Sequence, residues 1–207
     1  MWCGVSTKVD FNCDTMISRM FSIYLVLCYL LTICLSCRLL VPSELLNGCV
    51  FDPMIISVSH AGFSINRDNC NSVIAKHVFA EQPLVYYGRA RSDRTYTLML
   101  IDPDYPHHAN GQFYLHWLVT NIPGEFLRQG LTYDIGEYIV GYQAPDPPVF
   151  SGQHRYMVFV YEQLEHEIEV PQPDGRAKFD PISWMESFGG EDVIRGPIAS
   201  IGFKTEF

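Results

Sequence analysis

The feature that most constrains the fold is a series of short apolar runs, separated by turn residues, beyond residue 40. The runs are rich in Val, Ile, Tyr and Phe, and these residue types favour strands over helices. They occupy residues 55–58, 73–74, 84–87, 96–101, 115–119, 138–140, 156–161 and 198–203. Prolines between residues 103 and 148 end several of the runs, because proline cannot donate to a sheet ladder. The pattern predicts a mainly β domain.

One short helix is expected near the C-terminus, at residues 182–188. Asp180 is a good N-cap residue, and Pro181 suits the first helical position. Gly189 and Gly190 would end the helix, because glycine readily adopts the left-handed conformation that follows many helices. The domain is therefore predicted to be mostly β, with this one short helix.

Length and charge narrow the class of protein. A chain of 207 residues with 48% hydrophobic residues is long enough for one well-buried domain, which we expect at residues 38–207. The formal net charge of −9 excludes a duplex nucleic-acid binder, since no basic stripe is present to displace counterions. It also disfavours nonspecific electrostatic docking on anionic membranes. Any anionic ligand must therefore be held by local groups, and we expect a monomer.

Residues 1–37 have the pattern of a leader with a secretory signal. Arg19 precedes an apolar run at residues 20–36, and the small residues Ser36 and Cys37 mark a cleavage point. The alternative is a retained signal anchor, since the run is almost long enough to span a bilayer. We expect cleavage, and with it a protein that is secreted or lies in the lumen of the secretory pathway.

Cysteine positions agree with an oxidising compartment. Five of the seven cysteines lie at or before residue 37, so cleavage would leave only Cys49 and Cys70. A disulfide between them would add roughly 3 kcal/mol in the chain-entropy model. The alternative is two unrelated free thiols. The cysteine spacing does not resemble a zinc site, and we expect no metal or cofactor.

Acidic residues follow an apolar strand at residues 98–101. This run is apolar on both faces, which is typical of a central strand, and it leads into Asp102 and Asp104. Burying a carboxylate is unfavourable unless it faces a partner. An Asp-Pro-Asp turn whose carboxylates cap their own backbone is the alternative interpretation.

Two histidines and a tyrosine stand at the ends of other strands. Alternation places His116 on one face with Leu118 and Thr120, and Trp117 with Val119 on the other. His154 and Tyr156 share a face by the same rule, which leaves Arg155 on the opposite face as a structural ion-pair partner. Each residue alone also fits a buried structural role, but two acids, two imidazoles and a phenol together predict a shared pocket.

Three segments carry a resemblance to a known family. DPDYP at 102–106, HWLVTNIPG at 116–124 and GQHRY at 152–156 resemble signature blocks of the phosphatidylethanolamine-binding proteins, also called the Raf kinase inhibitor family. The resemblance covers roughly residues 45–207. The leader, the paired cysteines and residues 142–145 are most similar to its secreted branch.

The resemblance implies a large antiparallel sheet packed on a smaller sheet, with a small anion pocket that accepts phosphate-like groups such as phospholipid head groups. The implied ligand-binding residues are Asp102, Asp104, Pro106, His116, Ala144, Pro145, His154 and Tyr156. The chain departs from the family where His107 and His108 replace Ser-Arg, where Tyr114 replaces Trp, and where Ala144 replaces Gly. These changes affect ligand choice.

The functional prediction is a non-enzymatic protein that binds phosphate-bearing ligands and modulates signalling. One alternative is an inhibitor of a kinase or protease that acts by protein contact. A metal-dependent hydrolase is the least favoured, because metal-binding helices and nucleophile elbows are absent from the sequence, and Ser151 lacks the Gly-x-Ser-x-Gly frame.

A mechanism of binding follows for the leading function. We expect Asp102 to orient a histidine whose charged ring donates to phosphate, while Asp104 lies near the ammonium of ethanolamine, although the sequence does not rank these two roles. Binding should then weaken as pH rises through the histidine titration.

Overall fold

The computed structural model describes residues 46–207, so the predicted leader and its cleavage point lie outside the described residues. The larger sheet has the strand order β1-β9-β8-β5-β6-β7. Its strands are β1 (Asp52–Pro53), β5 (Thr95–Asp102), β6 (Tyr114–Pro123), β7 (Glu137–Val140), β8 (Gln153–Gln163) and β9 (Ile194–Glu206). All pairings are antiparallel except that of β1 with β9, which is parallel.

A smaller antiparallel sheet has the order β3-β2-β4. It consists of β2 (Ile55–Val58), β3 (Phe63–Ile65) and β4 (Leu84–Tyr86). The α-helices are α2 (Gly124–Gln129) and α3 (Pro181–Glu186), and the 3-10 turns are η2 (Ser59–Ala61), η3 (Arg67–Asn69), η4 (Lys76–Phe79) and η5 (Gly190–Asp192). The predicted mainly β fold with a large and a small sheet is confirmed. No helix within residues 46–207 is long and apolar enough to cross a bilayer.

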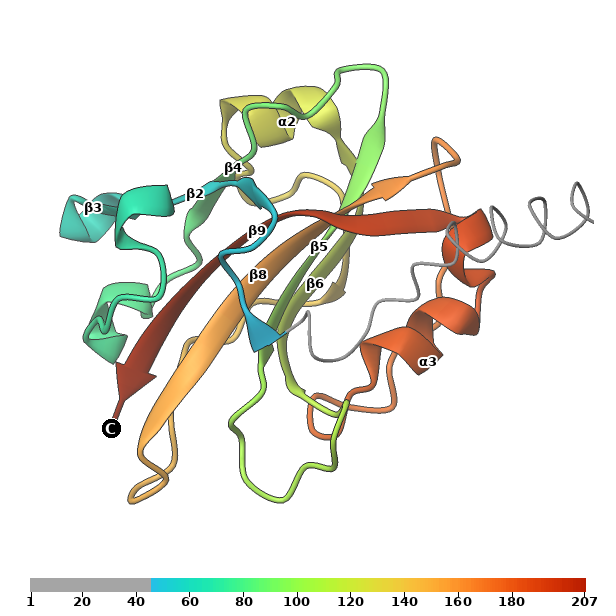
Figure 1. Ribbon diagram of the computed structural model, residues 1–207. Helices are drawn as coiled ribbons and strands as arrows, with labels where there is room; N and C mark the ends of the chain where they lie inside the picture. Colours follow the sequence, from blue (N-terminus) through green and yellow to red (C-terminus); the bar gives the residue numbers. More distant parts are fainter. Residues whose placement is uncertain (1–45) are drawn as a thin grey trace, which may run out of the picture. The chain divides into compact units, whose positions relative to one another are not determined.

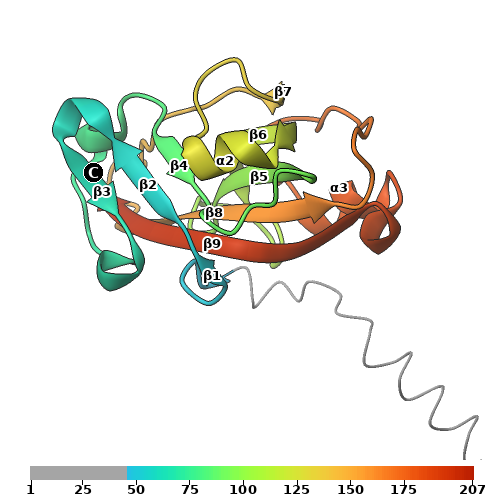
Figure 2. The ribbon, with the colours of Figure 1, turned by 90° about the horizontal axis from the view of Figure 1, so that it is seen from above.

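The large sheet is buried on both faces. Leu98 and Leu100 of β5 pack in one cluster with Ile56 and Val85 of the small sheet. Met99 and Ile101, which point the other way, pack in a second cluster that includes Trp184 and Met185 of α3. Figure 1 shows the small sheet and α3 on opposite sides of the long strands β8 and β9, and Figure 2 shows them towards opposite ends of these strands. The apolar run at 98–101 therefore forms a central strand, as the sequence predicts.

The C-terminal helix begins as expected. Asp180 Oδ1 accepts hydrogen bonds from the backbone N–H groups of Ile182 and Ser183, at 3.0 and 3.1 Å. These bonds satisfy two of the donors that a helix leaves open at its first turn. The disulfide between Cys49 and Cys70 is also present.

Three expectations about elements were wrong. A second helix, α2, starts directly after β6 at Gly124, where a side chain would meet the Arg91 carbonyl oxygen and the Tyr96 ring. Residues 73–74 form no strand in the described structure; Val73 makes one isolated bridge to Lys204. The last strand is longer than predicted, because β9 continues past Pro197 on both sides.

Candidate functional site

The strand order brings the candidate residues to one end of the large sheet. Asp102 is the last residue of β5, whereas His116 and His154 lie near the starts of β6 and β8. Both neighbours run antiparallel to β5, so their first residues meet its end. The three side chains come from segments distant in sequence, and all three are buried.

Asp102 and His154 form a buried hydrogen-bonded pair. His154 Nδ1 lies 2.7 Å from Asp102 Oδ2, and the two side chains are at most 1% exposed. His154 Nε2 lies 2.8 Å from Ser151 Oγ. The Ser151 hydroxyl donates to the Pro148 carbonyl oxygen at 2.7 Å, so its oxygen accepts from His154 Nε2.

This assignment fixes the charge of the pair. With a proton on Nε2, the Nδ1–Oδ2 contact must hold a second proton, either on the ring or on the carboxyl group. In both cases the pair carries no net charge. Burial raises the pKa of Asp102, although its hydrogen bond to His154 opposes the shift. A raised pKa of this carboxyl group agrees with a proton shared between Asp102 and His154. Asp102 orients a histidine, as the binding hypothesis requires.

A β-bulge aims His116 into the site. Leu100 and Ile101 of β5 pair with Trp117 and Leu115, so His116 between them has no partner on β5. The imidazole therefore lies on the same side as Tyr156 and Trp117, with its ring centroid 5.1 Å from that of Tyr156. The expected alternation of His116 and Trp117 was wrong, because a bulge puts two consecutive residues on one face.

His116 is held as a neutral ring. Its Nδ1 donates to the backbone carbonyl of Gln143 at 2.9 Å, so in the neutral ring Nε2 carries no proton. That Nε2 is buried and has no hydrogen-bond partner within residues 46–207. Burial is the main reason that the pKa of His116 falls to about 4. At neutral pH the Nε2 lone pair is thus an acceptor, and the expected charged donor is not found at this ring.

Tyr156 closes the other side of the site. Its ring stacks on Phe203 at 5.3 Å between centroids and meets the edge of His116. Burial, followed by the nearby Asp102 carboxylate, raises the pKa of Tyr156, so its hydroxyl remains a neutral donor. On β9, the buried Thr205 Oγ1 lies near the Tyr156 hydroxyl and partly opposes the rise in the pKa of Tyr156.

Aromatic side chains cover the imidazoles. The Tyr105 ring stacks on Tyr114 at 4.4 Å and faces His154 edge-on at 6.5 Å. Tyr114 also lies 5.0 Å from His116. Tyr105 also helps to line a cavity of about 230 Å³ formed mainly by residues 103–113. The half-buried Tyr105 and Tyr114 thus lie against the imidazoles.

Asp104 is paired with Arg155. Its Oδ2 accepts from Arg155 Nε and from the Arg155 backbone N–H, both at 2.8 Å, and its Oδ1 accepts from Arg155 Nη2 at 2.7 Å. These bonds outweigh partial burial and lower the pKa of Asp104. Arg155 is the ion-pair partner that the sequence indicated. Both oxygens of Asp104 are thus engaged by Arg155.

The remaining candidates lie on the loops around the site. The backbone N–H of Gln143 donates to the His116 carbonyl at 2.9 Å, which places Ala144 and Pro145 directly beside the bulge. Pro106 is half-buried next to Tyr105. The turn interpretation of Asp102 also holds in part, since Asp102 Oδ1 accepts from the Asp104 N–H at 2.7 Å.

Sequence reasoning gave no binding role to three contributors. Ser151 engages His154, Gln143 fixes the ring of His116, and Tyr105 lies edge-on against His154. Ser151 was considered only as a nucleophile, although its spacing, three residues before His154, also allows the observed contact. The Gln143 contribution comes from its backbone, so side-chain chemistry gives no signal for it.

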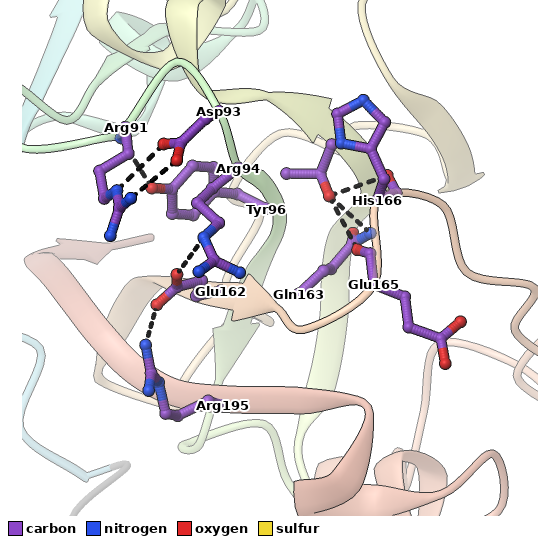
Figure 3. Close-up of polar contacts among 10 residues, drawn as sticks. Arg91, Asp93, Arg94, Tyr96, Glu162, Gln163, Glu165, His166 and Arg195 are labelled. Atoms are coloured by element: carbon purple, nitrogen blue, oxygen red, sulfur yellow. Dashed lines mark hydrogen bonds and ion pairs between the residues drawn. The ribbon is translucent and has the colours of Figure 1, made fainter.

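A second polar cluster lies at the opposite end of β5 and β8, and Figure 3 shows its contacts. Arg91 pairs with Asp93 through two bonds of 3.0 and 2.7 Å. Glu162 is held between Arg94 and Arg195. The carboxylates of Asp93 and Glu162 thus already have guanidinium partners, and a structural role accounts for them. Among residues 46–207, no group of three or more His, Cys, Asp or Glu side chains could hold a metal ion.

Comparison with known proteins agrees with this architecture. A family model described as phosphatidylethanolamine-binding protein matches residues 65–192. Protein MOTHER of FT and TFL1 homolog 2 of Oryza sativa is 35% identical over 77% of this chain and 87% of its own length. The 26 kDa secreted antigen of Toxocara canis is 39% identical over 46% of this chain, and the chain spans only 34% of that antigen.

Solved structures share the fold. A phosphatidylethanolamine-binding protein from Plasmodium vivax superimposes with a TM-score of 0.57 and 19% identity, over 75% of this chain and 87% of that one. A carboxypeptidase Y inhibitor, solved in complex with its cognate proteinase, gives a TM-score of 0.57 at 14% identity, over 75% and 84% of the two chains. The match of the family model, together with the rice relative, shows that the chain belongs to the phosphatidylethanolamine-binding protein family.

Proposed function

We propose that the protein is a non-enzymatic binding protein for phosphodiester head groups that carry an ammonium group. The observation that supports this most is the buried Nε2 of His116, for which residues 46–207 supply no hydrogen-bond partner. A buried acceptor without a partner is unfavourable by about 1–3 kcal/mol. A ligand that donates a hydrogen bond to Nε2 would remove that penalty.

The chemistry of the site selects the ligand. A neutral imidazole with a free lone pair accepts from an ammonium N–H, whereas the Tyr156 hydroxyl donates to a phosphate oxygen. The Asp102–His154 pair adds no net charge, so the site does not repel an anion despite its carboxylate. In this proposal Asp102, His116, His154 and Tyr156 form the floor of the site. Pro106, Ala144 and Pro145 form its rim, and Asp104 positions Arg155.

Water-soluble head groups test the proposal without membranes. Glycerophosphoethanolamine and glycerophosphocholine carry the same phosphodiester, but only the first has ammonium N–H donors. Isothermal titration should show binding of the ethanolamine compound, with about tenfold weaker binding of the choline compound, the loss expected for one charge-assisted hydrogen bond.

Two substitutions locate the interaction. His116→Phe keeps the aromatic contact with Tyr156 but removes the acceptor, and should abolish the preference for ethanolamine. His166→Phe, at an exposed histidine, is the matched control and should bind as the wild type does. Equal affinity of the wild type for both compounds would reject the role given to Nε2.

The alternatives have less support. A protein inhibitor remains consistent with a neighbour that was solved with its proteinase, but that likeness concerns the fold alone. Hydrolysis through Ser151 is disfavoured, because the Ser151 hydroxyl donates to Pro148 and not to His154.

We further propose secretion, as in the secreted branch of the family, with a leader at residues 1–37 and a single domain at 38–207. The disulfide and the secreted relative from Toxocara support it.

A further inference from the structure

We propose that the turn from Pro148 to Ser151 is a membrane-docking element, with Phe150 and Val149 entering the acyl region of a phospholipid bilayer. The proposal extends the proposed function, because it says how a protein that binds lipid head groups reaches them. Its occupant is a bilayer surface, and its test has a readout independent of the head-group site.

Phe150 has a conformation and an exposure that the fold does not explain. The turn is closed by the Ser151 N–H, which donates to the Pro148 carbonyl at 3.1 Å, and Phe150 is its third residue with φ of 66°. A positive φ at this position is usually adopted by Gly or Asn. The Phe150 side chain is also fully exposed, at 101%. A strained backbone and an exposed ring are both unfavourable for folding, which points to a function for the ring.

The turn is held firmly and is joined to the candidate site. Pro145 and Pro147 are buried at its base, so the loop is anchored while its tip projects. Figure 1 shows this loop, directly before β8, extending beyond the end of the large sheet. Ser151 at the end of the turn bonds to both Pro148 and His154. Docking of the tip would therefore bring a bilayer surface to the end of the sheet where the imidazoles lie.

Further exposed apolar residues lie at the same end of the sheet. Phe207 follows the end of β9 and is 66% exposed, and Val73, which bridges to Lys204 of β9, is also exposed. Lys76 connects this region to the loop, since its Nζ lies 4.5 Å from the Phe207 ring and 2.8 Å from Asp146 Oδ1. The apolar residues thus come from several segments around one end of the sheet, as expected for a surface that meets a bilayer.

Charge favours a bilayer with neutral lipids. Residues 147–152 contain no charged side chain, and the nearest acid, Asp146, is paired with Lys76. The chain as a whole carries a net charge of −9, so attraction to anionic lipids is not the driving force. A bilayer can accept an uncharged, protruding aromatic tip without a matching groove. A protein partner would need a complementary groove for the same tip. We therefore expect docking on zwitterionic membranes that depends little on salt.

Tryptophan probes in the full chain test the contact by position. Phe150→Trp and Tyr133→Trp each place an indole at an exposed aromatic position, the second in the loop before β7. Vesicles of phosphatidylcholine and phosphatidylethanolamine with brominated acyl chains should quench the probe at position 150 several-fold more than the probe at 133. The wild type supplies the background of native tryptophans. Equal quenching of the two probes, or no quenching at position 150, would overturn the inference.

A glycine variant separates docking from folding and from head-group binding. Phe150→Gly relieves the positive φ, so the melting temperature should stay the same or rise. Its affinity for glycerophosphoethanolamine should equal that of the wild type. A clear fall in the melting temperature, or a loss of head-group affinity, would show that the ring serves the fold or the pocket and would also overturn the inference. If the wild type binds no soluble head group but position 150 is quenched, the proposed function fails and the docking turn stands.

Discussion

At the scale of single residues, the neutral state of His116 is the property on which the site depends. Its ring lies on the bulge of β6, donates through Nδ1 to Gln143 and presents an unprotonated Nε2. A charged imidazole would have suited phosphate as a donor, but burial holds the pKa near 4. In the proposed function, a ligand at Nε2 must therefore bring its own donor.

The lowered pKa of His116 makes a prediction about stability. Because the folded pKa of about 4 lies below the ordinary value of 6.5, the unfolded chain binds a proton that the folded chain does not bind between these values. The contribution of His116 to the free energy of unfolding is present above pH 6.5 and is lost as pH falls towards 4, by up to about 3 kcal/mol. Urea unfolding of wild type and His116→Phe at pH 7 and pH 4 should show that the free energy of unfolding falls less for the variant.

The exposed control His166→Phe should follow the wild type at both pH values in the same unfolding experiment. An equal fall for wild type and His116→Phe would mean that His116 is not desolvated as described.

The side-chain types at the site could be predicted from the sequence, but their geometry could not. Strand alternation placed His154, Arg155 and Tyr156 on the correct faces, because β8 is regular from His154 to Val160 in its pairing with β9. Alternation failed at His116, because the bulge depends on how β6 pairs with β5, which a single strand does not encode. Arg155 was expected to be an ion-pair partner, but its carboxylate, Asp104, could not be named, because alternation along β8 does not show which acid lies nearby.

At the scale of elements, the two helices show what local signals can and cannot predict. Helix α3 begins with a capping Asp180 and a proline, and both are visible in the sequence. Helix α2 has no side-chain cap, and it forms where Gly124 fits tightly against Arg91 and Tyr96. Tertiary packing therefore determines α2, and the sequence pattern alone missed it.

The cap of α3 can be tested directly. Asp180→Ala removes the acceptor for the Ile182 and Ser183 N–H groups and should lower the free energy of unfolding by about 1 kcal/mol. Asp180→Asn keeps an acceptor and should recover most of that loss in a chemical denaturation experiment. If alanine and asparagine destabilise the protein equally, the stabilisation does not come from the cap.

At the scale of the whole molecule, the disulfide ties the start of the described chain to the segment between β3 and β4 of the small sheet. Cys49 and Cys70 are 21 residues apart, which corresponds to roughly 3 kcal/mol in the chain-entropy model. Replacing both cysteines with serine should lower the free energy of unfolding by about that amount. Ligand affinity should change little, since neither cysteine is hydrogen-bonded to the site residues described above. A variant as stable as the wild type would show that the disulfide does not stabilise the protein by reducing the conformational entropy of the unfolded chain.

The global fold was the most predictable level. Strand-forming runs and proline-rich turns gave the mainly β class, and the motif resemblance gave the two sheets, because both depend on patterns spread along the chain. The parallel pairing of β1 with β9 was not predictable, since a two-residue strand leaves almost no pattern. The site lies between these levels, as its residues come from regular strands but its contacts come from a bulge and three loops.

The most direct test of the central claim is the ratio of two dissociation constants, for glycerophosphocholine and glycerophosphoethanolamine, measured on the wild type at pH 7. An acceptor at His116 Nε2 predicts a ratio of about ten, which should fall to one in His116→Phe. A ratio of one in the wild type, or a ratio that is unchanged by the substitution, would contradict the account.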